Sequence, residues 1–410
     1  MSTRGVVFVC SSLGGEALRC ANAIKDLDDV TLKICIADKN DLIETAKALP
    51  NIYRIVTAQE TLLATVAVAN EALGLSAMSS EVVARTLDKS KLKATLRRAG
   101  VTTPREEIVN RAEDARRFVG EVGLPIVLKS LNGSGALTTF RISTETELTR
   151  ILSLMKLPVI AETYLDGQEL CVDTVTIRNE PQCYSVCCYD PPILDALEDP
   201  SMQWRCVMPR DLSPYNPFIQ QGLEAVRALQ VGNAMTHMEG FINASGPAGF
   251  VDATLRPAGA RIGPMFGLAH DVDPYRVWAR VAVDDGFDGP LERKYAVGTI
   301  FIRGSGSGFV EIVEGIESVE EHLSSVIVEA RWPKPGGPKS ATYTGDGFVT
   351  VRHPDTCVVE DALDFIDRTI RITYSSSQPI ETGWSERMHN FRELNKPAWD
   401  FEAARIKRQS

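Results

Sequence analysis

The chain has 410 residues, of which 44% are hydrophobic and 24% charged, and its formal net charge is -10. This length exceeds one ordinary core and predicts two to four compact units, while the composition excludes a disordered or fibrous protein. The acidic balance, without any block of Lys and Arg, argues against nucleic acid and anionic membrane surfaces as partners.

The N-terminal apolar run and the cysteines bear on localisation. The run at residues 5–10 is too short for a signal peptide, and no later stretch is long enough to span a membrane. Nine cysteines are scattered without a repeated Cys-x-x-Cys pair, which predicts mostly buried, reduced thiols. We therefore expect a cytoplasmic protein.

Short apolar strands alternate with helical segments at the start of the chain. Such alternation predicts a parallel, doubly wound sheet. The Gly14-Gly15 pair in the first turn is weak evidence for a phosphate loop, because any tight strand-to-helix turn favours glycine. The expected strands are 5–10, 30–38 and 52–58, and the expected helices are 15–27 and 59–73.

The middle of the chain changes to hairpins. Ser79 or Ser80, with Glu81 nearby, indicates a helix start, and a second helix is expected to stop at Gly100. The glycine-bearing turn that follows leads into a strand rather than a helix, so it is neither a Rossmann nor a Walker loop. Strands are expected at 123–130, 136–142 and 158–177, with a turn at 166–167, and on both sides of the turn at 243–249; helices are expected at 214–229 and 273–283.

From Lys294 onward the pattern is that of a small β-rich module. The last residues, 377–410, are polar and of mixed charge, which is typical of a surface helix or a loose tail. The expected strands are 295–304, 308–315, 324–331, 347–353 and 370–376, with one helix at 361–369.

Several charged residues lie at structurally informative positions. Lys129 closes an apolar strand and needs an anion or solvent, whereas Lys89 is equally consistent with a solvated helix charge. Glu162 and Glu169 flank a turn and are equally consistent with exposed side chains. No single one of these residues establishes a site.

Glu239 and Asp252 form the strongest local pattern. They are separated by a turn, so they can face each other on paired strands, where two carboxylates repel unless a cation joins them. Arg256 is one candidate for that cation. Magnesium, which takes carboxylate oxygens together with substrate phosphates, is the other.

The order of these motifs resembles the ATP-grasp superfamily, and most closely its carboxylate–amine ligase branch, which includes the L-amino-acid (dipeptide) ligases. The segments that carry the resemblance are "LDKSKLKATLRRAGVTTP", "GLPIVLKSLNGSGALTTFRI", "AETYLDGQEL", "HMEGF" and "FVDATLRP". It covers roughly Val6 to Tyr374 and implies an α/β fold, α+β in its centre, with a β-rich, lid-like C-terminal region. The units implied are a pre-ATP-grasp domain at 1–88, a small ATP-grasp subdomain with the glycine loop at 89–160, a central subdomain at 161–293, a C-terminal module at 294–376 and the tail at 377–410.

The resemblance also implies roles for individual residues. Lys129 and Arg256 would be catalytic, with Arg256 steadying the reacting phosphate and carboxylate. Glu162 would take the adenine amine and Glu169 the ribose hydroxyls. The complete ATP set is Lys89, Lys129, Asn132, Gly133, Ser134, Gly135, Glu162, Thr163, Tyr164, Leu165 and Glu169, and the Mg²⁺ or Mn²⁺ set is Glu239, Asp252 and Thr254.

Two residues depart from the family pattern. The family usually has a glutamate where this chain has Asp252 and an asparagine where it has Thr254. Aspartate still ligates magnesium but reaches one methylene less, and a hydroxyl is a weaker ligand than an amide oxygen. These changes bear on the number of metal ions and on turnover.

The chemistry implied is ADP-forming ligation of a small carboxylate, such as an amino acid, to an amine through an acyl phosphate. Two alternatives remain: a carboxylase-type enzyme that uses carboxyphosphate, and a degenerate protein that binds ATP without catalysis. Homodimers are common in the family, so a homodimer is one assembly implied. Arg205, Arg261, His237 and His270 are further candidates to face the substrates, without an assigned role.

Overall fold

The computed structural model describes residues 3–37, 41–131, 138–340 and 342–376. The predicted glycine loop, Asn132 to Gly135, and the predicted tail at 377–410 lie outside the described residues. Within the described part, no helix is both apolar enough and long enough to cross a membrane.

The N-terminal residues form the predicted parallel sheet. Its strand order is β2-β1-β3, and β1 pairs in parallel with both neighbours. Apolar residues on both faces of β1 are buried, as a parallel strand between helices requires. The elements are β1 (Arg4–Cys10), α1 (Gly15–Lys25), β2 (Val30–Ile36), α2 (Leu42–Lys47), β3 (Ile52–Val56) and α3 (Glu60–Ala72).

Two capped helices lead from this domain to a small antiparallel sheet. Ser79 caps the first helix by accepting from the Val82 N–H, which confirms the predicted start. The small sheet has the order β4-β7-β5-β6, so the predicted hairpin around the glycine loop is confirmed by the β5–β6 pairing. The elements are α4 (Ser80–Leu87), α5 (Lys89–Arg98), β4 (Glu106–Val109), α6 (Ala112–Val122), β5 (Ile126–Ser130), β6 (Thr139–Ile142), α7 (Glu145–Leu154) and β7 (Val159–Thr163).

An eight-stranded antiparallel sheet forms the centre of the molecule, in the order β12-β11-β8-β9-β10-β13-β16-β15. Alternate residues along its strands enter two different cores: Cys171 and Val175 join one core, and Leu170 and Val172 join the other. The strands are β8 (Gln168–Ile177), β9 (Glu180–Asp190), β10 (Trp204–Met208), β11 (Ala234–Asn243), β12 (Gly246–Thr254), β13 (Ala296–Ile302), β15 (Ile327–Arg331) and β16 (Gly347–His353).

Helices cover both faces of the central sheet. Residues of α9 belong to the core that contains Leu170, and residues of α10 and α11 belong to the core that contains Cys171. The buried Arg54 of β3 binds Asp285, just beyond α11, at 2.7 Å and so joins the N-terminal domain to this layer. The elements are α8 (Ile193–Glu198), the short 3-10 helix η1 (Ser213–Tyr215), α9 (Asn216–Leu229), α10 (Ile262–His270) and α11 (Pro274–Asp284).

The C-terminal strands extend the central sheet. β13 pairs with β10 on one side and with β16 on the other, so the predicted domain boundary at residue 293 falls between strands of one sheet. A separate two-stranded sheet, β14-β17, and two helices complete this region. The elements are β14 (Ser307–Glu314), α12 (Ile316–Leu323), α13 (Thr356–Thr369) and β17 (Arg371–Ser376).

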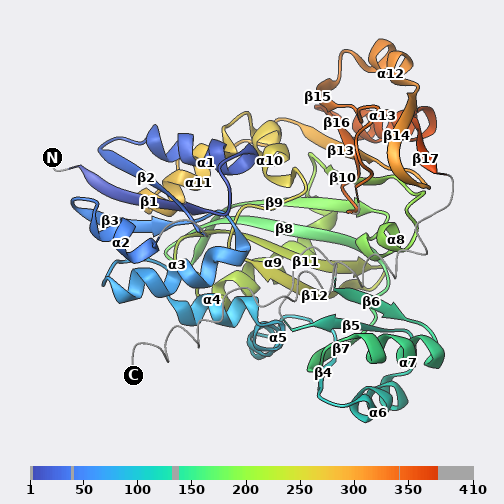
Figure 1. The fold of residues 1–410 in the computed structure, drawn as a ribbon, viewed down its shortest axis with the longest axis horizontal. Helices are drawn as coiled ribbons and strands as arrows, with labels where there is room; N and C mark the ends of the chain where they lie inside the picture. Colours follow the sequence, from blue (N-terminus) through green and yellow to red (C-terminus); the bar gives the residue numbers. More distant parts are fainter. Residues whose placement is uncertain (1–2, 38–40, 132–137, 341, 377–410) are drawn as a thin grey trace.

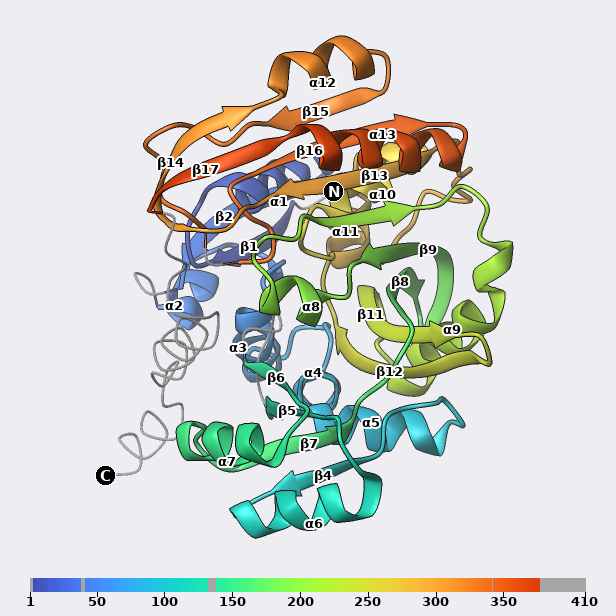
Figure 2. The ribbon, with the colours of Figure 1, turned by 90° about the vertical axis from the view of Figure 1, so that its right-hand side faces the viewer.

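The ribbon views show how these parts surround the centre. In Figure 1 the N-terminal domain (blue) lies at one end of the central strands, and the small sheet (teal) and the C-terminal elements (orange) lie on opposite sides of the other end. Figure 2 shows the same separation after a 90° turn, with β8, β9 and β11 between the two. Residues from the small sheet, the central sheet and the C-terminal region can therefore meet at one place.

Candidate active site

A cavity of about 160 Å³ lies where the small sheet meets the central sheet. Every described residue that the sequence assigned to ATP, metal or catalysis lines it: Lys89, Lys129, Glu162, Thr163, Tyr164, Leu165, Glu169, Glu239, Asp252, Thr254 and Arg256. These residues come from five separate segments of the chain. The assignment of an individual role to each residue stays a prediction.

Glu239 and Asp252 face each other as expected. They are direct partners in the register of β11 and β12. Asp252 forms an ion pair with Lys89. Burial raises the pKa of the Asp252 carboxyl, but Lys89 and Lys129 outweigh burial, so the net shift of this pKa is downward. Asp252 is therefore an ionised ligand candidate.

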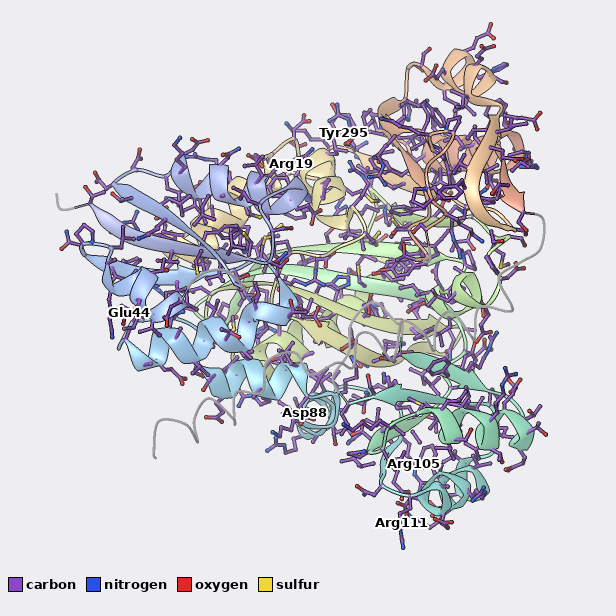
Figure 3. The ribbon with its side chains drawn as sticks, viewed as in Figure 1. Arg19, Glu44, Asp88, Arg105, Arg111 and Tyr295 are labelled. Carbon is purple, nitrogen blue, oxygen red and sulfur yellow. The ribbon has the colours of Figure 1, made fainter. Side chains whose placement is uncertain are left out.

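Asp88 fixes the position of Lys89. Its side chain caps α5 by accepting from the Ser90 and Lys91 N–H groups, so Lys89 is the first residue of the helix. Figure 3 shows Asp88 between the N-terminal helices and the small subdomain. The Lys89 ammonium is therefore buried in the cavity wall rather than solvated.

Glu162 lies between two buried lysines. Its Oε1 accepts from Lys93, and its Oε2 is 2.8 Å from the Lys129 ammonium. Burial raises the pKa of Glu162, but the charges of Lys129 and Lys93 outweigh burial and lower it overall, so the carboxylate stays ionised. For Lys129, burial outweighs Glu162 and lowers the pKa of the ammonium. Both predicted nucleotide residues thus belong to one charge network.

Lys93 was not among the site residues predicted from the sequence. It lies one helical turn after Lys89, and its side chain is fully buried. The spacing of four residues on α5 places both lysines on one helix face, which is a signal that the sequence does contain.

The segment between β7 and β8 carries the predicted adenine and ribose contacts. Thr163, Tyr164 and Leu165 line the cavity at the turn, and Glu169 follows on β8. Glu169 accepts from the Ile193 N–H at 2.6 Å. Burial, followed by the charge of Glu239, raises the pKa of Glu169 to about 8.

The donor set beside Glu239 fits a hard divalent cation. Two carboxylates face each other, and the buried Thr254 hydroxyl has no hydrogen-bond partner among the described residues. Such oxygen donors suit Mg²⁺ or Mn²⁺. Glu239, Asp252 and Thr254 are therefore the residues that would hold the ion.

Arg256 does not join the two acids. Its guanidinium instead binds Glu60, the first residue of α3, at 2.9 Å. Glu60 also lines the cavity. Sequence reasoning missed Glu60, because nothing in its local pattern distinguishes it from an ordinary helix-start acid.

An aromatic wall also lines the cavity and was not expected. Trp204 contacts Tyr189 and Tyr343 edge-on, with ring centroids 5.4 Å and 4.8 Å away. The Trp204 indole N–H is buried without a partner in the described part of the chain. Tyr343 comes from the segment between β15 and β16, so the C-terminal region contributes to the site.

The four further candidates separate into two groups. His237 lines the cavity. Burial lowers the pKa of His237, but the neighbouring Asp173 carboxylate outweighs burial, so the net shift is upward. His270, Arg205 and Arg261 do not line this cavity; Arg205 pairs with Asp190 and Asp364, and Arg261 pairs with Glu329.

Comparisons with known proteins bear on this arrangement. A family model described as a RimK-like ATP-grasp domain matches residues 86–179. Alanine–anticapsin ligases from Bacillus subtilis and Bacillus amyloliquefaciens are 31% and 30% identical over 129 residues, or 28% of this chain. The match spans 27% of the length of these curated relatives.

Solved structures match over nearly the whole chain. The L-amino acid ligase from Bacillus licheniformis has a TM-score of 0.72 at 17% identity, covering 92% of this chain and 100% of that one. N5-carboxyaminoimidazole ribonucleotide synthetase from Thermotoga maritima has a TM-score of 0.66 at 14% identity, with coverage of 92% and 100%. The chain therefore has the ATP-grasp fold, as its motifs predicted, and its residues 86–179 match the RimK-like ATP-grasp model.

Proposed function

We propose that the protein is an ATP-dependent, ADP-forming ligase that joins a small carboxylate to an amine. The observation that carries the proposal is the convergence, in one cavity, of paired acids, buried lysines, a turn suited to adenine and an arginine. The ligases named among the similar proteins support this reaction class. An amino acid as the acid substrate is part of the proposal.

In the proposed mechanism, a substrate carboxylate oxygen attacks the γ-phosphorus of ATP, giving an acyl phosphate and ADP. The amine nitrogen then attacks the acyl carbon, loses a proton and displaces phosphate. A Mg²⁺ or Mn²⁺ ion held by Glu239, Asp252 and Thr254 would neutralise charge on the phosphate oxygens. Little covalent work falls to the side chains.

The side chains would bind and orient the reactants. Lys89 and Lys129 would hold the phosphates, and Arg256, by leaving Glu60, would bind the incoming carboxylate and the transferred phosphoryl group. The aromatic wall would exclude water, which would otherwise hydrolyse the acyl phosphate.

The cellular compartment and the oligomeric state are also part of the proposal. All nine cysteines are free and most are buried, which supports a reducing, cytoplasmic environment. A homodimer stays a prediction.

Two substitutions test the proposed function. Glu239→Gln and Arg256→Ala should reduce ADP formation to background, because one removes a metal ligand and the other a phosphoryl-binding cation. The measurement is ADP release in a coupled assay, with circular dichroism to check folding. Arg205→Ala, which removes a guanidinium outside the cavity, is the matched control and should keep ADP formation. Full activity of either site variant would refute the assignment.

The carboxyphosphate alternative is distinguished by its substrate. N5-carboxyaminoimidazole ribonucleotide synthetase shares this fold, so the fold alone does not separate the two reactions. ADP release that depends on bicarbonate, rather than on an organic acid and an amine, would favour the alternative.

A further inference from the structure

A hydrogen-bonded series of side chains leads from inside the central sheet to Glu239. Asp173 on β8 and His237 on β11 are register partners, and Glu239 follows His237 on the same face. The Nδ1 atom of His237 is 2.7 Å from Asp173 Oδ1, and its Nε2 atom is 3.2 Å from Glu239 Oε1. Each ring nitrogen therefore faces a carboxylate oxygen, and an ionised carboxylate oxygen accepts from a protonated nitrogen.

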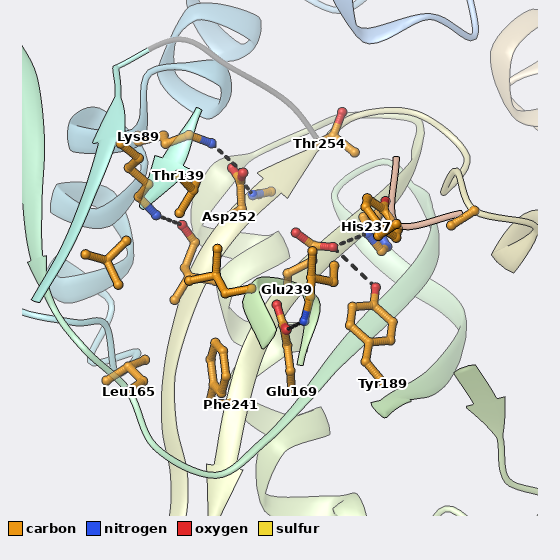
Figure 4. A pocket seen from close by; sticks show the side chains of 18 of the residues that line it. Lys89, Thr139, Leu165, Glu169, Tyr189, His237, Glu239, Phe241, Asp252 and Thr254 are labelled. Carbon is orange, nitrogen blue, oxygen red and sulfur yellow. Dashed lines mark hydrogen bonds and ion pairs between the residues drawn. The ribbon is translucent and has the colours of Figure 1, made fainter. Parts of the chain in front are cut away.

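A second donor reaches the same oxygen of Glu239. The Tyr189 hydroxyl of β9 donates to Glu239 Oε1 at 3.3 Å. Figure 4 shows both interactions converging on one carboxylate oxygen, while the other oxygen of Glu239 points toward the side of Asp252. The two oxygens of Glu239 are therefore in different environments.

This arrangement restrains a side chain that would otherwise rotate freely. Glutamate has three side-chain torsions, and ordering them at the moment of binding costs free energy. A ligand carboxylate already held by hydrogen bonds avoids that cost, and losing such partners typically weakens metal binding by about 10- to 100-fold. Asp173 in turn fixes the orientation of the His237 ring.

We propose that Asp173, His237 and Tyr189 are positioning residues that hold Glu239 by one oxygen, so that its other oxygen binds the divalent cation beside Asp252. This inference rests on the proposed function, because it concerns the same metal site. It adds three residues to that site, each of which would act through Glu239.

A competing use of the same residues must be separated from this one. The donor atoms of Cys171, Asp173 and His237 lie within 4.8 Å of one another, which is close enough to hold a metal ion. A thiolate, a carboxylate and an imidazole would suit zinc. Zinc beside Asp173 and Cys171 would take the Nδ1 atom of His237, which now binds Asp173, so Asp173 could not then orient the ring through this hydrogen bond.

The test is Mn²⁺ binding, measured by electron paramagnetic resonance with a non-hydrolysable ATP analogue. Tyr189→Phe keeps the ring and removes one donor, and His237→Phe removes the other. We expect Mn²⁺ affinity to fall by about 10-fold or more in His237→Phe. The loss should be smaller in Tyr189→Phe. His237→Gln, whose amide can replace the Nε2 donor, should recover part of the affinity.

Controls separate positioning from loss of the fold. His270→Phe removes another buried imidazole, which binds the Phe266 carbonyl, and should leave Mn²⁺ binding unchanged. Binding of the analogue in excess EDTA should be equal in all variants. Equal Mn²⁺ affinity in the wild type, Tyr189→Phe and His237→Phe would overturn this inference but not the proposed function. Stoichiometric zinc in the purified protein, lost in Cys171→Ser, would overturn the role of Asp173, because zinc would replace its hydrogen bond to the ring. Absence of Mn²⁺–nucleotide binding by the wild type would overturn the metal site as well.

Discussion

At the scale of single residues, burial governs the charges of the site. Glu162 is ionised because Lys93 and Lys129 compensate for its desolvation. Among the described residues, Glu169 is bound by the Ile193 N–H and by no cation, and burial raises its pKa to about 8. Two glutamates of one motif, seven residues apart in the sequence, therefore carry different charges at neutral pH.

The raised pKa of Glu169 predicts a pH dependence of stability in the metal-free protein. Between about pH 4.5 and pH 8 the folded state keeps a proton that the unfolded state has lost. The free energy of unfolding should therefore fall as pH rises through this range, by up to about 1.4 kcal/mol per pH unit from this group. Urea denaturation at several pH values should show a smaller fall in Glu169→Gln.

The exposed Glu317→Gln is the control for this measurement and should follow the wild type. If the free energy of unfolding changed with pH equally in Glu169→Gln and the wild type, Glu169 would not be a buried, protonated carboxyl group.

Residue identities were largely predictable from the sequence, but their pairing was not. Lys129 was recognisable because a lysine rarely closes an apolar strand. The Glu60–Arg256 pair joins residues 196 positions apart, and the Asp173–His237 contact depends on which strands are neighbours. Neither contact follows from local pattern.

At the scale of elements, periodicity predicted the strands and helices that carry the site. The β11–β12 pairing brings Glu239 opposite Asp252 as the turn spacing suggested. Short elements such as α2 and β4 were missed, because four to six residues hold too little periodic signal.

The turn between β7 and β8 requires a glycine. Gly167 has φ +129°, and an added Cβ would lie 2.3 Å from the Ile242 carbonyl oxygen of β11. Gly167→Ala should therefore lower the free energy of unfolding by about 1–3 kcal/mol and weaken ATP binding, because the adjacent residues line the cavity. Urea denaturation and nucleotide titration measure both effects.

Gly120→Ala is the matched control, because this glycine lies within α6 with nothing within 4 Å of an added Cβ. It should be neutral or stabilising, by up to about 1 kcal/mol. An equal effect of the two substitutions would show that close approach to β11 is unimportant.

At the scale of the whole molecule, the sequence predicted the ATP-grasp fold but not how its parts join. The C-terminal region reads as a separate β-rich module, yet β13, β15 and β16 extend the central sheet. Every residue of β13 is buried, which is the pattern of an interior strand. Through Tyr343 this region also reaches the cavity. Only the assembled structure shows that four parts of the chain build one site: the N-terminal domain through Glu60, the small sheet, the central sheet and the C-terminal region.

Product stoichiometry distinguishes ADP-forming ligation from other ATP-dependent reactions. The purified protein would be supplied with ATP, Mg²⁺ and a panel of amino acids and other small acids and amines, singly and in pairs, with nucleotides, phosphate and amides quantified together. We expect equal amounts of ADP, phosphate and amide, and only when both an acid and an amine are present. Formation of AMP and pyrophosphate, or of amide without ADP, would contradict it.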